Sequence, residues 1–271
     1  MRQTALVRAL SLLLVALLVP SAMAADDVPS AETAATPAAA PLLEWEVVSR
    51  RPHDESAFTQ GLLLDDDGRM FESTGLYGGS SLREVDPLSG EVLRRVAVPD
   101  DSFAEGLALV EDDLIQLTWR AGLARRYSRD GLRLIGSHAY DGEGWGLCHD
   151  GERLVMSDGS DTLTFRDPVT FAPLGSVTVT VLGESLAALN ELECVEDAVW
   201  ANVWQTDAIV RIDPADGRVT GVLDLAGIVE PDPAASDPSA VLNGIAHDEE
   251  AGTFLVTGKR WPELVEIRIL E

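Results

Sequence analysis

The chain has 271 residues, of which 46% are hydrophobic, and its 46 Asp and Glu against 20 Lys and Arg give a formal net charge of −26. The apolar content is too high for a disordered chain, the acidity argues against nucleic acid or an anionic membrane as a partner, and two cysteines exclude a disulfide-dense scaffold. Of the 20 basic residues, 19 are Arg and only Lys259 is Lys.

Residues 1–24 have the pattern of a secretory signal peptide. Two arginines come before or at the start of an apolar run over residues 9–19, and Ala22-Met23-Ala24 supplies the small residues of a cleavage site. The run is too short to span a bilayer. Residues 25–42 are rich in Ala and Pro and are interpreted as a tether. We therefore expect an exported protein, periplasmic or secreted, without a membrane anchor, whose folded catalytic domain covers residues 43–271.

The rest of the chain contains five similar units. Each unit opens with an apolar strand that begins near a polar or aromatic residue, and these aligned residues are Gln60, Glu105, Trp145, Glu191 and Asn243. A second apolar run follows about ten residues later, a third ends in a turn in four of the units, and a fourth run comes next. Four short strands in each unit of about 40–50 residues are typical of a β-propeller blade.

The two ends of the chain are expected to meet in one blade. The fifth unit stops at its third strand, over residues 264–270, and the strand-like segment 43–49 belongs to no unit. An N-terminal strand that completes the last blade would close the ring and cover its open edge. The sequence therefore predicts an all-β, five-bladed β-propeller whose last blade is closed by the N-terminal strand.

Unusual side chains gather where the units should meet at one mouth of the central channel. That mouth is formed by the starts of the first strands and the ends of the second strands. The first-strand starts contain Phe58, Gln60, Phe103, Glu105, Glu143, Trp145, Asn190, Glu191 and Asn243, and the second-strand ends contain Trp119, Trp204 and Lys259. The glycines of these motifs repeat from unit to unit, as packing positions should, but the polar residue differs in each unit. This divergence indicates a shared asymmetric site.

Common metal and nucleophile motifs are absent from the sequence. The four histidines are scattered, no HxH, HExxH or CxxC spacing predicts a zinc site, and no GxSxG predicts a catalytic serine. Ser157 is interpreted as a hydrogen-bonding strand residue, and we expect neither a metal nor a cofactor. Cys148 and Cys194 occupy equivalent positions in adjacent units, and whether they are bonded stays open.

Ten motifs occur in a fixed order along the chain. They are FTQGL at 58–62, ESTGLY at 72–77, SSLR at 80–83, QLTW at 116–119, EGWGL at 143–147, SDGS at 157–160, LNELE at 189–193, ANVW at 201–204, LNGI at 242–245 and VTGK at 256–259 followed by WP. Together they resemble the glutamine cyclotransferases of the plant and bacterial type, over roughly residues 44–269. The resemblance implies a five-bladed propeller that converts the N-terminal glutamine of peptides or proteins to pyroglutamate, releases ammonia and requires no metal. We expect a monomer.

The resemblance also implies roles for individual residues. The family's general acid/base matches Glu105, and its channel residues match Phe58, Gln60, Phe103, Trp119, Trp145, Asn190, Trp204 and Lys259. We assign Lys259 a second catalytic role, to hold the developing oxyanion or to orient Glu105. Glu191 and Asn243 complete the predicted substrate-binding set, and Glu143 or Glu191 is the alternative acid/base. Ala104 departs from the family pattern, in which Gly precedes the catalytic Glu.

Two functions from other classes stay open. In calcium-dependent propeller lactonases, Glu and Asn side chains around the channel coordinate the metal, and this chain has Glu and Asn at the predicted channel mouth. A non-catalytic exported propeller would use the same residues to bind a ligand. Cyclisation of a Gln-initiated peptide in the presence of a chelator distinguishes these possibilities.

Overall fold

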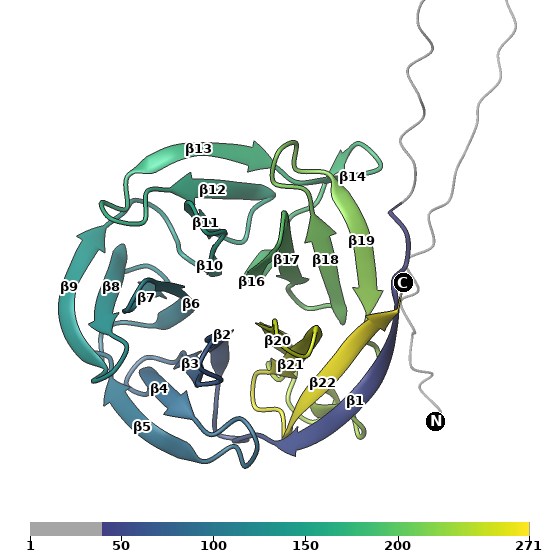
Figure 1. The fold of residues 1–271 in the computed structure, drawn as a ribbon, viewed down its shortest axis with the longest axis horizontal. Helices are drawn as coiled ribbons and strands as arrows, with labels where there is room; N and C mark the ends of the chain where they lie inside the picture. The colour runs from purple at the N-terminus through teal and green to yellow at the C-terminus, as the bar shows by residue number, and fades with distance from the viewer. Residues whose placement is uncertain (1–39, 271) are drawn as a thin grey trace, which may run out of the picture. The chain divides into compact units, whose positions relative to one another are not determined.

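The computed structural model describes residues 40–270, which form five antiparallel four-stranded sheets around a central channel (Figure 1). The predicted signal peptide and most of the predicted tether lie outside the described residues. The fold class predicted from the repeats, an all-β five-bladed propeller, is confirmed. Within residues 40–270, no helix is long and apolar enough to cross a membrane.

Each blade runs from an innermost strand at the channel to an outermost strand at the rim (Figure 1). Blade one contains β2 (Thr59–Leu64), β3 (Met70–Thr74), β4 (Ser81–Val85) and β5 (Val92–Ala97). Blade two contains β6 (Ala104–Val110), β7 (Asp113–Thr118), β8 (Leu123–Ser128) and β9 (Arg133–Ala139). Blade three contains β10 (Leu147–His149), β11 (Leu154–Met156), β12 (Thr162–Arg166) and β13 (Pro173–Thr178). Blade four contains β16 (Leu189–Val195), β17 (Ala198–Val203), β18 (Ala208–Ile212) and β19 (Val219–Asp224).

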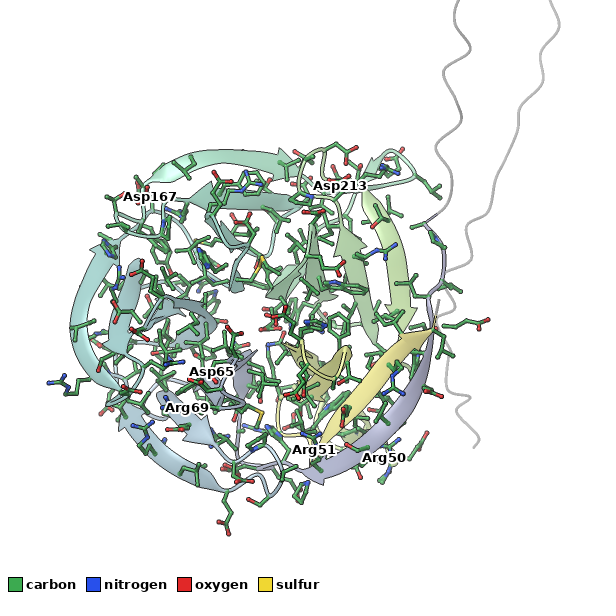
Figure 2. The ribbon with its side chains drawn as sticks, in the orientation of Figure 1. Arg50, Arg51, Asp65, Arg69, Asp167 and Asp213 are labelled. Atoms are coloured by element: carbon green, nitrogen blue, oxygen red, sulfur yellow. A yellow bond between two sulfur atoms is a disulfide. The ribbon has the colours of Figure 1, made fainter. Side chains whose placement is uncertain are left out.

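Blade five is completed by the N-terminal strand, as predicted. It contains β20 (Leu242–Asp248), β21 (Thr253–Gly258), β22 (Glu263–Leu270) and β1 (Glu44–Pro52), and β1 pairs antiparallel with β22. Arg50 and Arg51, labelled on β1 in Figure 2, form ion pairs with Glu263 and Glu266 of β22, each at 2.6 Å. The two ends of the described chain therefore share one sheet, which closes the ring without leaving β22 as an open edge.

Two small elements lie between blades. A short hairpin follows blade three, and a single turn of 3-10 helix lies in the long connection between blades four and five. They are β14 (Thr180–Val181) with β15 (Glu184–Ser185), and η1 (Pro233–Ala235). The long connection accounts for the wide spacing between the fourth and fifth units of the sequence.

The hydrophobic core consists of five clusters, one between each pair of neighbouring blades. Between blades one and two, for example, Phe71 and Leu82 pack with Leu107 and Leu114, and all four side chains are buried. Outermost strands such as β5 and β9 are largely exposed, whereas β3 and β4 are buried at every residue. A blade alone cannot cover both faces of its sheet, so the apolar runs of one unit require the next unit as a partner.

The glycines that recur in the first strands are packing positions, as predicted. A Cβ added to Gly106 would lie 2.5 Å from the backbone nitrogen of Leu147 in the next blade. A Cβ on Gly61 would lie 2.7 Å from the backbone nitrogen of Leu107. Only glycine allows the innermost strands to approach this closely, which keeps the channel narrow.

Cys148 of β10 and Cys194 of β16 form a disulfide with their Cα atoms 5.5 Å apart. The bond joins the innermost strands of blades three and four, and it answers the question that the sequence left open. Equivalent positions in adjacent blades come within bonding distance here because both lie on strands that line the channel.

Candidate active site

A cavity of about 490 Å³ opens at the mouth of the channel where the first strands begin and the second strands end. Nine of the residues predicted for the site line it: Phe58, Gln60, Phe103, Glu105, Trp119, Trp145, Asn190, Trp204 and Lys259. They come from all five blades or from the turns that join their strands. The structure thus gathers most of the predicted set in one place.

Aromatic rings form most of the cavity wall. The ring of Phe103 packs edge-on against Phe58 and Trp119, with centroid distances of 6.1 and 5.7 Å. On the other side, Trp145 and Trp204 are perpendicular to each other at 5.5 Å. Edge-to-face contacts of this kind are favourable and give each ring a defined orientation. The result is an apolar wall around a few polar groups, as small-molecule sites usually have.

Glu105 lies on β6, and its side chain is buried against this wall. The backbone carbonyl of Glu105 accepts a hydrogen bond from the Ser73 hydroxyl, which in turn accepts one from Gln116 at 2.8 Å. Burial, opposed by the charge of Lys259 and assisted by that of Glu143, raises the pKa of Glu105 well above its usual value. A carboxyl group in this environment can give and take a proton nearer to neutral pH.

Lys259 follows β21 and is 5% exposed. Its ammonium lies 5.1 Å from the centroid of the Phe58 ring. Burial, partly offset by the charge of Glu105, lowers the pKa of Lys259 to about 8. Among residues 40–270 no ion pair within 4.0 Å involves Lys259 or Glu105, so both groups remain available to a ligand in the cavity.

Asn243 does not line the cavity; it supports a residue that does. Its amide nitrogen donates to the carbonyl of Thr59 at 2.9 Å and to Gln60 Oε1 at 3.1 Å. Gln60 therefore has its oxygen engaged and can offer its amide N–H groups to a ligand. Asn190, on β16, contributes a second amide to the cavity lining.

Glu191 also lies outside the cavity lining, in contrast to the expectation that it binds substrate. Its two carboxylate oxygens accept the backbone N–H of Leu62 at 3.3 Å and of Ile245 at 2.8 Å. It therefore ties blade four to blades one and five across the channel. Burial and the nearby charge of Glu193, offset by these two backbone bonds, raise the pKa of Glu191 well above its usual value.

The first strands are irregular where the predicted site residues lie. In blades one, two, four and five, the pairing of the first strand with the second shifts register at the predicted site residues. In blade four, for example, the shift lies between Leu189 and Leu192. A bulge of this kind interrupts the alternation of side chains and re-aims them locally.

Glu143 lies outside the cavity lining but contacts two of its walls. Its Oε2 accepts hydrogen bonds from the indole N–H of Trp119 at 2.7 Å and of Trp145 at 3.1 Å. Partial burial acts to raise the pKa of Glu143, but the hydrogen bonds from Arg120, Trp145 and Trp119 lower it overall. An ionised, bonded carboxylate is poorly suited to the alternative acid/base role considered from the sequence.

Four cavity residues were not predicted. They are Gln205, Pro238, Ser239 and Val241. Gln205 follows Trp204 with a positive φ of 62°, and the other three lie in the long connection before β20. For these three, the unusually long interval between the fourth and fifth units was the available signal, since its extra residues are not needed to form a blade.

Two other groups have structural contacts. The Ser157 hydroxyl accepts from the backbone N–H of Gly146 and donates to the carbonyl of Asn190, in keeping with its interpretation as a hydrogen-bonding strand residue. Ala104, the position that departs from the family pattern, is fully buried, and its N–H donates to Ser80. No group of three or more His, Cys, Asp or Glu side chains within residues 40–270 is arranged to hold a metal ion.

Comparisons with known proteins agree with the resemblance seen in the motifs. A family model described as glutamine cyclotransferase matches residues 15–269. The chain is 41% identical over 231 residues to glutaminyl-peptide cyclotransferase of Arabidopsis thaliana, covering 83% of this chain and 71% of the plant protein. Its structure is similar to the crystal structure of Myxococcus xanthus glutaminyl cyclase, with a TM-score of 0.76, 38% identity, and coverage of 85% of this chain and all of the other. The WD40 repeats of RRP9, at 10% identity, a TM-score of 0.52, and coverage of 86% of this chain and 99% of the other, share the fold alone.

Proposed function

The chain belongs to the glutamine cyclotransferase family, and on this premise we propose that Glu105 is the general acid/base of a glutaminyl-peptide cyclotransferase that converts N-terminal glutamine to pyroglutamate. One observation carries the assignment of the residue. Glu105 is the carboxyl group that lines the aromatic cavity, with Lys259 as the one ammonium beside it among the cavity-lining residues.

The reaction is intramolecular. The substrate's α-amine attacks the carbon of its own γ-carboxamide, the new C–N bond closes a five-membered lactam, and the old C–N bond breaks to release ammonia. Because the attacking group is already tethered, holding the reactive conformation supplies much of the acceleration. One proton must leave the amine and one must reach the departing nitrogen, and Glu105 moves it from the first to the second. The raised pKa of Glu105 suits both the acceptance of the proton from the amine and its donation to the departing nitrogen.

The other cavity residues bind and stabilise. Lys259 donates to the oxygen that becomes negative when the amine attacks, as preorganised donors do in other acyl transfers. The amide groups of Gln60 and Asn190 bind the carboxamide and backbone of the substrate. The indole and phenyl faces exclude water, which strengthens the charge interactions inside the cavity.

The activity is tested by incubating the chain, from residue 25 onward, with a Gln-initiated peptide and EDTA. Mass spectrometry should show the loss of one ammonia from the peptide, with no loss from a control peptide that begins with Asn or N-acetyl-Gln. Unchanged peptide would contradict the proposed function. Loss that occurs only without EDTA would favour metal-dependent chemistry of the kind seen in propeller lactonases, and binding without turnover would favour a recognition module.

We also propose that the protein is exported and acts as a monomer without a metal. The signal-peptide pattern of residues 1–24 and the Cys148–Cys194 disulfide support export, since disulfides persist in oxidising compartments. Fractionation of cells that express the full chain tests export, because an exported enzyme is recovered outside the cytoplasm with its first residues removed.

Replacing Lys259 by Arg is expected to lower kcat by about tenfold or more, although the charge is kept. The planar guanidinium is larger than the ammonium, and the site is 5% exposed. The Lys259 ammonium loses its charge as pH rises through about 8, so wild-type activity should fall above that pH. In the Arg variant, which keeps its charge, this fall in activity should occur at higher pH.

Steady-state kinetics measured across this pH range check both the lower kcat and the shifted pH profile. Arg268→Lys, on the exposed end of β22, is the control, and wild-type kinetics in Lys259→Arg would return Lys259 to a packing role.

A further inference from the structure

One carboxylate outside the cavity connects two of its walls. Trp119 follows β7 in blade two, and Trp145 precedes β10 in blade three, so the two rings come from different sheets. Both indole N–H groups nevertheless donate to the same oxygen, Oε2 of Glu143. A buried or half-buried indole N–H normally needs a partner, and here a single acceptor satisfies two of them.

The second oxygen of Glu143 is engaged as well. Oε1 accepts from Arg120 Nε at 2.8 Å, and the Arg120 guanidinium lies 3.8 Å from the centroid of the Trp119 ring. Arg120 therefore bonds to the Glu143 carboxylate and also lies over the face of the Trp119 ring. With both oxygens bonded, the carboxylate has little freedom to rotate. Its fixed position in turn holds the two indole rings that donate to it.

The charge of Glu143 also acts on the proposed acid/base. The ionisable groups close enough to interact with the charge of Glu105 are Lys259 from blade five, Glu143 and Tyr140. Of these, Lys259 favours the ionised form of Glu105 and Glu143 favours the protonated form. Tyr140 donates its hydroxyl to the carbonyl of Thr118, next to Trp119. Two opposite charges therefore act on Glu105, and Glu143 supplies the negative one.

We propose that Glu143 is a positioning residue, whose carboxylate fixes the relative orientation of the Trp119 and Trp145 walls and keeps a negative charge beside Glu105. This inference rests on the proposed function, because it assigns Glu143 a part in the same site. Glu143 does not touch the substrate; it acts through two indole rings that do and through the field at Glu105. Small displacements of positioning groups can cost on the order of 10²-fold in rate, so the expected effect is large for a residue outside the cavity.

Two substitutions separate the geometric and electrostatic parts. Glu143→Ala removes both indole bonds and the charge, and it should raise KM and lower kcat/KM by on the order of 10²-fold. Glu143→Gln keeps an amide oxygen for the indole groups but removes the charge. It should retain much of the wild-type KM, while the acidic limb of its kcat/KM profile moves to lower pH, because loss of the negative charge lowers the pKa of Glu105.

The control is Asp113→Ala, which breaks an Arg–carboxylate pair of blade two whose residues do not line the cavity. Asp113 pairs with Arg126 at 2.6 Å and lies at the far end of β7 from Trp119. Kinetics of Asp113→Ala should match the wild type. An equal loss of kcat/KM in Asp113→Ala and Glu143→Ala would overturn the proposal, since the effect would then follow from the loss of any Arg–carboxylate pair.

A readout that needs no turnover distinguishes this inference from the proposed function. Near-UV circular dichroism reports the fixed environment of indole rings, and Glu143→Ala should change it more than Asp113→Ala does. If wild-type protein cyclises no peptide, the proposed function fails, and the dichroism still decides whether Glu143 orients the two rings. If wild type is active and Glu143→Ala keeps its KM and its dichroism, the inference fails alone. Should Glu143→Ala not fold, a pH profile of Glu143→Gln that superimposes on the wild type overturns it.

Discussion

Glu105→Gln is expected to leave the propeller intact and lower kcat by on the order of 10²-fold or more, the range for loss of a general acid–base. Gln is nearly isosteric with Glu, and the strand position is held through the backbone by Ser73 rather than through the carboxylate. The amide cannot carry the proton from the attacking amine to the departing nitrogen. Turnover of a Gln-initiated peptide, followed by ammonia release, measures the effect.

Glu111→Gln is the matched control, because Glu111 is an exposed carboxylate just beyond the other end of the same strand. It should behave as wild type in kinetics and thermal unfolding. Turnover of Glu105→Gln within a few-fold of wild type would contradict the assignment. The role would not pass readily to Glu143 or Glu191, because neither lines the cavity.

Removing the disulfide should have the largest effect on stability. In the chain-entropy model, a bond that closes a loop of this sequence separation, 46 residues, contributes about 4 kcal/mol to the free energy of unfolding. The double variant Cys148→Ala and Cys194→Ala is therefore expected to unfold at a much lower urea concentration. Its kcat and KM under native conditions should match the wild type, because neither cysteine lines the active-site cavity.

Reduced wild-type protein is the control for this experiment. Its urea midpoint should fall together with that of the double variant, and the variant itself should not respond to reductant. Equal midpoints for oxidised wild type and the double variant would show that the bond adds nothing to the packing of blades three and four. A loss of activity in the folded variant would show that the bond between the innermost strands of blades three and four influences the site.

Most of the architecture could be predicted from the sequence because a propeller repeats. Each unit contains its own four strands and turns, and the turns at Asp167 and Asp213, labelled at the rim in Figure 2, follow from Asp side chains that accept nearby backbone N–H groups. Ring closure was predictable for the same reason, since a unit that lacks one strand and a strand that lacks a unit have one obvious partner.

The cavity walls were predictable only as a group. Divergence among aligned positions identified the mouth of the channel and brought Glu105, Lys259 and the tryptophans into one set. It could not show that Glu143 bonds two indole rings, because Trp119 and Trp145 belong to different blades and are 26 residues apart in the sequence. It also could not place Pro238 and Ser239, which reach the cavity from a connection that repeats nowhere else.

The sequence by itself determined the number of blades, the closing strand and the mouth of the channel where the cavity opens, because these depend on the repeated pattern of the units. Only the tertiary structure decided which polar side chains reach the cavity. The first strands shift register at these residues, so the strand period alone does not give the direction of each side chain: Asn190 lines the cavity, while Glu191 accepts the backbone N–H groups of Leu62 and Ile245. Contacts across the channel join residues more than 50 positions apart, and no pattern within one unit encodes them.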